Sequence, residues 1–185
     1  MPSIGDASVA LHCHPLAACA AVQALTVAVR AREGRLLMSY ALSADLKRLR
    51  IPQARPAVRA HELWRHTCFE AFVGEAGSAG YCELNFAPSR AWALYRFSGR
   101  REGMRVDDDT RAPDITVRHT DSGLSLDAQV LLLDLIPSGA PLGLRIGLAA
   151  VLEDRDGRLS YWAARHPSGK PDFHHPDSFT LKLAP

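Results

Sequence analysis

Two apolar stretches of the sequence contain polar residues of the kinds that bind ligands. Glu70 lies within CFEAF, and Glu83 and Asn85 lie two residues apart in YCELNF. If these stretches are β-strands, Glu83 and Asn85 share one face, because side chains two residues apart point to the same side of a strand. Trp64 precedes the first stretch, and Trp162 lies in SYWAAR. Sugar recognition uses this mixture, since indole rings stack on apolar C–H faces while carboxylates and amides hydrogen-bond to hydroxyl groups.

Each of these residues also has an ordinary structural interpretation. A buried tryptophan is a common core residue of a β-sandwich, and a glutamate on an outward face is unremarkable. Glu70 and Glu83 also suggest the carboxylate pair of a glycosidase. A chain of 185 residues leaves little length for the long loops of a deep cleft, and no G-x-S-x-G, G-x-G-x-x-G or Walker-type loop is present. We therefore expect a protein that is not an enzyme.

A second polar group lies in KPDFHHPDSF, near the end of the chain, and contains Asp172, His174, His175 and Asp177. These residue types fit a metal site, an acid/base pair or a loop that forms one wall of a pocket. Pro176 favours an extended conformation for His175. In an extended segment His174 and His175 point to opposite sides, so they are poorly placed to hold one ion together. We expect a proline-braced loop with His174 facing inward, as a candidate ligand contact, and Phe173 and His175 on the opposite side.

Three further motifs contain residues that bind metals. HELWRH resembles a metalloprotease helix, but His61 and His66 are five residues apart, which separates them by about 140° around a helix. The spacing in HCHPLAAC (12–19) matches no common zinc pattern. DDD (107–109) is typical of a solvated loop, with a structural Ca²⁺ as the alternative. We expect neither a metal centre nor a cofactor.

The elements that carry these residues follow a period of two. Alternating apolar residues in ALTVAV (24–29) and LLMSYAL (36–42) flank the turn REGR, and TCFEAFV (67–73) and YCELNF (81–86) form a second hairpin. Further strands are predicted at 91–98, 114–120, 124–133, 142–153, 158–166 and 178–183. Residues 43–66 form a long connection with one helical turn near Asp45–Leu49. The pattern predicts a single domain, 1–185, with an all-β fold: an antiparallel β-sandwich of jelly-roll or immunoglobulin-like type, preceded by an irregular segment at 1–20.

Composition excludes several classes of partner. The hydrophobic content of 47% and the net charge of +2 are ordinary for a globular protein. Between Lys47 and Arg65 the chain has a basic stretch, but no aromatic residue lies among its basic residues before Trp64, so we expect a solvated loop and no nucleic-acid surface. No run of about eighteen apolar residues exists, and the N-terminus lacks a basic region, so we expect no membrane partner and no signal peptide. A cytoplasmic location with reduced Cys13, Cys19, Cys68 and Cys82 follows as an expectation.

The segment LWRHTCFEAFVGEAGSAGYCELNFAPS resembles the L-W-x-x-D-x-x-E-x-F…Y-x-E/Q-x-x-x-N/P signature of DOMON-like domains. This superfamily includes family 9 carbohydrate-binding modules and haem- or sugar-binding domains of redox proteins. The ending KPDFHHPDSFTLKL is similar to the closing segment of the family, and the whole chain looks like a stand-alone bacterial DOMON-like protein. In strand order the likeness covers roughly residues 20–183.

The resemblance implies a β-sandwich with a ligand site on a sheet surface or between edge loops. In sugar-binding members a tryptophan and, six residues later, a glutamate belong to the site, and Trp64 and Glu70 match that spacing. Glu83 and Asn85 would be the polar residues of the next strand. Two departures are visible: Thr67 replaces the Asp of the signature, and Glu83 stands where some sugar binders carry Arg.

The predicted function is binding of a carbohydrate or a similar small polar ligand, with the contacts Trp64, Glu70, Glu83, Asn85, Trp162 and His174. One alternative is a protein-interaction or accessory domain without a small ligand. Another is a haem- or metal-binding domain, because haem-binding members use Met and His, and Met38, Met104 and His174 are available. No motif ties these residues to haem, and the sequence leaves the oligomeric state open.

Overall fold

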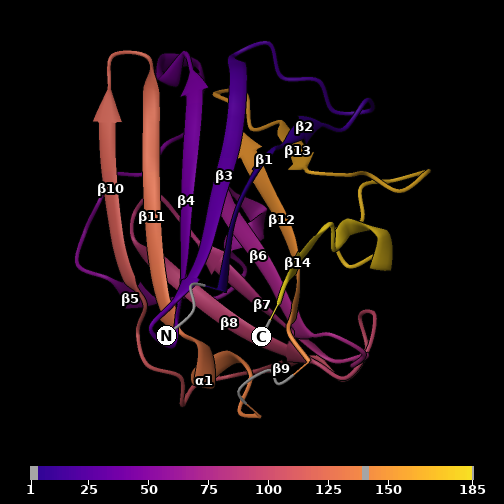
Figure 1. The fold of residues 1–185 in the computed structure, drawn as a ribbon. Helices are drawn as coiled ribbons and strands as arrows, with labels where there is room; N and C mark the ends of the chain where they lie inside the picture. Colours follow the sequence, from indigo (N-terminus) through magenta and orange to yellow (C-terminus); the bar gives the residue numbers. More distant parts are fainter. Residues whose placement is uncertain (1–3, 139–141, 185) are drawn as a thin grey trace.

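The computed structural model describes residues 4–138 and 142–184, which form two sheets packed face to face (Figure 1). The first sheet has five strands in the order β1-β3-β4-β11-β10: β1 (Ile4–Ala10), β3 (Val22–Arg32), β4 (Arg35–Ala44), β11 (Gly123–Leu131) and β10 (Asp114–Thr120). Every pairing within it is antiparallel. The β3–β4 hairpin confirms the turn predicted at REGR, and β10 and β11 form a second hairpin.

The second sheet has nine strands and includes the hairpin predicted from TCFEAFV (67–73) and YCELNF (81–86). Its main path is β2-β13-β12-β6-β7-β8-β5, with β14 paired to β12 and β9 paired to β8: β2 (His12–Cys13), β13 (Leu159–Ala163), β12 (Leu144–Glu153), β6 (Cys68–Glu75), β7 (Tyr81–Phe86), β8 (Ala91–Phe97), β5 (Val58–Arg59), β14 (Leu181–Leu183) and β9 (Arg105–Val106). The β5–β8 pair is parallel, and the other pairs are antiparallel. The predicted all-β antiparallel sandwich is therefore confirmed.

The main core lies between the sheets and follows the period of two in each strand. Val27 and Met38 from the first sheet and Phe69 and Leu84 from the second are at most 1% exposed. The Tyr40 hydroxyl, also in this core, donates a hydrogen bond to the backbone oxygen of Glu70 (2.8 Å) and so links the two sheets. This bond satisfies a buried polar group, and it fixes β6 opposite β4.

The outer face of the second sheet is buried as well. A separate apolar cluster covers it, composed of Phe72, Tyr81, Ala93, Tyr95, Phe97, Ala149, Val151, Ala163 and Phe173. Every residue of β7 is consequently buried, so neither face of this strand meets bulk solvent. The C-terminal segment before β14 supplies Phe173 to this cluster and runs alongside the sheet (Figure 1).

Two short elements differ from the sequence expectations, and a third agrees with them. The segment 1–20, expected to be irregular, contains β1 and β2, although its first three residues lie outside the described part of the chain. Pairing with β3 orders β1, in which Ala7 and Val9 pack against the core and alternate with the exposed Asp6 and Ser8. The strand expected at 124–133 ends at Leu131, and Leu132–Leu135 forms a helical turn, α1. The helical turn expected near Asp45 is present as a 3₁₀ turn at Leu46–Arg48, with the Asp45 side chain capping it.

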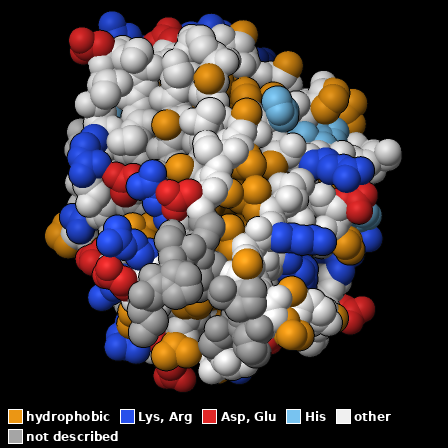
Figure 2. Space-filling model, in the orientation of Figure 1, with side chains coloured by type: hydrophobic (Ala, Val, Ile, Leu, Met, Phe, Trp, Pro, Cys, Tyr) orange, Lys and Arg blue, Asp and Glu red, His pale blue; other side chains and the backbone are white. Residues whose placement is uncertain are grey.

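No helix in the described ranges is long and apolar enough to cross a membrane. Figure 2 shows basic and acidic side chains interspersed over one face of the molecule, with hydrophobic side chains in a band near its centre.

Candidate ligand-binding pocket

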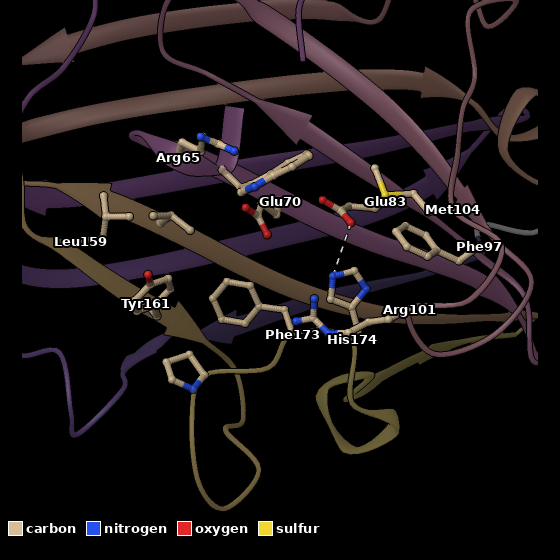
Figure 3. A pocket seen from close by; sticks show the side chains of 13 residues that line it. Arg65, Glu70, Glu83, Phe97, Arg101, Met104, Leu159, Tyr161, Phe173 and His174 are labelled. Atoms are coloured by element: carbon tan, nitrogen blue, oxygen red, sulfur yellow. Dashed lines mark ion pairs between the residues drawn. The ribbon is translucent and has the colours of Figure 1, made fainter. Parts of the chain in front are cut away.

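A cavity of about 550 Å³ lies over the outer face of the second sheet. Glu70 from β6 and Glu83 from β7 form part of its floor and point into it side by side (Figure 3). Tyr161 from β13 and Phe173 from the C-terminal segment lie across the cavity from these carboxylates. Polar groups therefore converge beneath a largely aromatic enclosure, as in many small-molecule sites.

The pairing of β6 with β7 places the acidic residues together. Glu70 is opposite Asn85, and Phe72 is opposite Glu83. Because opposite residues in a ladder share a face, Glu70, Glu83 and Asn85 all lie on the outer face, as the sequence predicted. The exposed fractions are 2% for Glu70, 5% for Glu83 and 0% for Asn85. Asn85 lies beneath the floor and does not line the cavity.

The two glutamates differ in their hydrogen bonds. Asn85 donates a bond from Nδ2 to Oε1 of Glu83 (2.8 Å), and the Cys68 thiol donates to Oδ1 of Asn85 (3.4 Å). Oε1 of Glu70 is buried and has no hydrogen-bond partner within the described part of the chain. A buried acceptor without a partner costs roughly 1–3 kcal/mol, so the Glu70 carboxyl group, which lines the cavity, carries an unsatisfied oxygen.

Burial keeps protons on this pair of acids. It raises the pKa of Glu83 to about 7, although the hydrogen bond from Asn85 and the charge of Arg101 act in the opposite direction. The pKa of Glu70 is raised further from its ordinary value, first by burial and then by the charge of Glu83. Two neighbouring carboxylates in a poorly solvated site cannot easily ionise together. At neutral pH the pair therefore retains at least one proton.

His174 closes the pocket beside Glu83. Its Nε2 lies 3.6 Å from Oε2 of Glu83, and its Nδ1 lies 2.8 Å from the Tyr81 hydroxyl. Burial and the charge of Arg101 lower the pKa of His174 to about 4, so the ring is neutral at pH 7. The backbone N–H of Arg101 donates to the Tyr81 oxygen (3.2 Å), which leaves the Tyr81 hydroxyl proton for Nδ1. The ring proton of His174 then resides on Nε2 and points toward Glu83.

His174 faces inward as predicted, but Phe173 does not lie on the opposite side. Residues 173–174 form a turn instead of an extended segment, so both side chains line the same cavity. Asp172 holds this turn in place, because its carboxylate binds Arg101 (3.0 Å) and Arg100 and accepts a bond from the His174 backbone N–H (3.1 Å). His175 accepts a hydrogen bond from the Asp177 N–H and stays outside the cavity.

The predicted tryptophans lie in different places. Trp64 is half-buried, lines the cavity and packs edge-on against Tyr95, with ring centroids 5.2 Å apart. Trp162 lies in the core between the sheets, where its Nε1 donates to Ser160 Oγ (3.0 Å), so the structure does not bring it to the pocket. Side chains alternate along β13, and the neighbouring Tyr161 lines the cavity instead.

Sequence reasoning missed Arg101, Tyr161 and Phe173, which all line the cavity. Phe97 also lines the cavity, and it lies with Tyr95 on the outer face of β8. Arg101 lies in a loop with φ of 57°, where no periodic pattern reports on side-chain direction.

The other candidate motifs have structural roles. In HELWRH the residues Leu63–Arg65 form a 3₁₀ turn, and His66 Nδ1 lies 2.7 Å from Oε2 of Glu153. Asp107 of the DDD motif binds Arg96. Across residues 4–138 and 142–184, no group of three or more His, Cys, Asp or Glu side chains is arranged to hold a metal ion. Of the residues named for haem, Met38 is buried in the core between the sheets, whereas Met104 and His174 both line the cavity.

No protein-family model matches the sequence, so the resemblance to DOMON-like domains stays a prediction, and no curated protein matches it either. Two solved structures share the fold. One is a candidate carbohydrate-binding protein from Bacteroides uniformis ATCC 8492, with a TM-score of 0.58 and 11% identity over 95% of this chain and 84% of that one. The other is a family 9 carbohydrate-binding module from Caldicellulosiruptor kristjanssonii in complex with cellotriose, with a TM-score of 0.50 and 12% identity over 87% of this chain and 75% of that one. At these identities the chain is similar to both in its fold, a β-sandwich of the kind seen in family 9 modules.

Proposed function

We propose that this protein is a non-catalytic domain that binds a carbohydrate in the pocket above Glu70 and Glu83. The observation that carries the proposal is the pair of buried carboxyl groups beneath aromatic walls, with one oxygen of Glu70 lacking a partner. A sugar hydroxyl that donates to this oxygen would remove the cost of leaving it unsatisfied.

The shape and lining of the pocket support a ligand of this class. Its volume of about 550 Å³ falls within the roughly 300–1,000 Å³ typical of small-molecule sites. Trp64, Tyr161 and Phe173 offer flat apolar surfaces to the C–H faces of a sugar ring. The fold shared with proteins described as carbohydrate-binding is a further support.

We expect binding without turnover of glycosides. The two solved structures that share the fold are described as a candidate carbohydrate-binding protein and a carbohydrate-binding module.

Isothermal titration with glucose, cellobiose and cellotriose tests the proposal. We expect measurable binding that weakens at least tenfold in Trp64→Ala and in Glu70→Ala, because a stacking surface and a hydroxyl acceptor are lost. Trp162→Phe is the matched control, since it changes a tryptophan that lies outside the pocket, and its affinity should equal that of the natural protein. Unchanged affinity in Trp64→Ala and Glu70→Ala would rule out this site, and the absence of binding by any sugar would refute the function.

A further inference from the structure

The floor of the pocket has two acidic side chains and no cation of its own. Neither Glu70 nor Glu83 forms an ion pair with Lys or Arg in the described part of the chain. Burying an ionised carboxylate without a counter-charge costs several kcal/mol. Among the residues that the structure describes, no Lys or Arg therefore supplies a paired countercharge at the position where a ligand would lie.

The two arginines that line the pocket form ion pairs with other acidic residues. Arg101 lines the pocket, but its guanidinium binds Asp172 through Nη2 (3.0 Å) and Nε (3.3 Å). Arg65, also in the lining, pairs with Glu62 (3.0 Å). Both arginines therefore have acidic partners elsewhere, and Arg101 acts on the floor acids through its charge, without an ion pair to either of them.

The remaining titratable groups near the floor cannot supply a positive charge. Cys68, Tyr81 and Tyr95 become negative when they ionise. His174, the one ring that could become positive, is buried beside Arg101 and neutral at pH 7. Its Nε2–H offers Glu83 a neutral donor, and Glu70 receives none.

The walls above the floor suit a cationic group. Trp64, Phe97, Tyr161 and Phe173 line the cavity, and the faces of aromatic rings attract cations electrostatically. An ammonium group carries one positive charge and three N–H donors, which match the free oxygen of Glu70 and the carboxylate of Glu83.

We propose that the carbohydrate bound here is an amino sugar whose ammonium group lies at the pocket floor between Glu70 and Glu83. This inference rests on the proposed function and specifies its ligand class. The bound cation stabilises the ionised form of both acids, so the proton that the free pair retains leaves to solvent on binding. A neutral sugar would not displace that proton.

Titration at pH 6.5 with glucose, 2-amino-2-deoxyglucose, 6-amino-6-deoxyglucose and the two N-acetylated derivatives tests the inference. N-acetylation removes the charge and keeps the sugar ring, and the two isomers allow for either orientation. We expect at least one amino sugar to bind ten times more tightly than glucose and than its own acetylated form. Repeating the titration in two buffers of different ionisation enthalpy should reveal proton release for the amino sugar and none for glucose.

Glu70→Gln separates the ammonium from the hydroxyl contribution. The amide oxygen still accepts a hydrogen bond from a hydroxyl, so glucose affinity should stay within a few-fold, whereas the preference for the amino sugar should disappear. Glu33→Gln, in the exposed β3–β4 turn, is the matched control and should keep the full preference.

The outcomes distinguish this inference from the function on which it rests. Equal affinities for amino and neutral sugars would overturn the ammonium site while leaving carbohydrate binding intact. Failure of every sugar to bind would overturn both. Propylammonium binding as tightly as the best amino sugar would show that the sugar ring contributes nothing and would also overturn the proposal.

Discussion

The natural protein should lose stability as pH rises, because Glu83 ionises while it is buried. Replacing Glu83 with Gln should abolish this loss. The carboxyl group ionises near pH 4.5 in the unfolded chain but near pH 7 in the folded protein, because it is buried. Between these values the folded state binds more protons than the unfolded state, so stability falls as pH rises. At about 1.4 kcal/mol per pKa unit, the difference between 4.5 and about 7 corresponds to about 3 kcal/mol, reached in full above pH 7.

Glutamine does not titrate, so the variant should gain stability over the natural protein by about 3 kcal/mol between pH 5 and pH 8. The charge of Glu83 also raises the pKa of Glu70, and removing that charge adds to the gain. His174 has the opposite dependence: its lowered pKa costs stability as pH falls from 6.5 toward about 4. Because His174 is present in both proteins, this contribution largely cancels in the comparison.

Urea unfolding followed by tryptophan fluorescence at pH 5, 6, 7 and 8 measures the effect. The informative quantity is the difference between the unfolding free energies of the variant and the natural protein at each pH. A difference that stays constant from pH 5 to pH 8 would show that Glu83 titrates normally and that the pocket floor is well solvated.

Three further predictions follow from the contacts. Trp162→Ala should lower the free energy of unfolding by about 3–5 kcal/mol in the same assay, because it opens a cavity in the core, and the folded fraction should bind sugars with unchanged affinity. Gly123→Ala should lower the free energy of unfolding by about 3 kcal/mol or more, because the added Cβ would lie 1.9 Å from the Leu42 backbone oxygen. Gly34→Ala is the control: no heavy atom lies within 4 Å of its added Cβ, so it should lower the free energy of unfolding by only about 1 kcal/mol, the cost of a left-handed backbone. Asp172→Asn should release the Arg101 guanidinium toward the floor acids, and calorimetry should then show a weaker preference for amino sugars; an unchanged preference would contradict the charge argument.

The floor of the site could be predicted from sequence because it depends on local rules. Alternation puts Glu83 and Asn85 on one face, and the glycine-rich turn between the two stretches makes them a hairpin. The hairpin register then brings Glu70 opposite Asn85. Each step involves residues fewer than twenty positions apart, so no knowledge of the distant packing was needed.

The walls of the site could not be predicted in the same way. Alternation separates Tyr161 from Trp162 but does not say which face is the interior, because both faces of the second sheet are buried. Trp162, which has the larger aromatic ring, was therefore predicted to contact the ligand, but it lies in the core. Phe173 and Arg101 depend on turns whose conformation is fixed by long-range contacts, above all those of Asp172.

The C-terminal segment contributes to the burial of Glu70 and Glu83, as the strands do. The turn at Phe173 and His174 covers part of the outer face of β6 and β7, and its removal would leave Glu70 and Glu83 more exposed to water. Asp172 fixes that turn by binding Arg100 and Arg101, and the same contact withholds Arg101 from the floor. The Asp172 carboxylate thus both closes the pocket and leaves the negative charge of the floor acids without an ion pair to Arg101. The proline-flanked segment shapes the site through this anchor, and only one of its two histidines, His174, reaches the cavity.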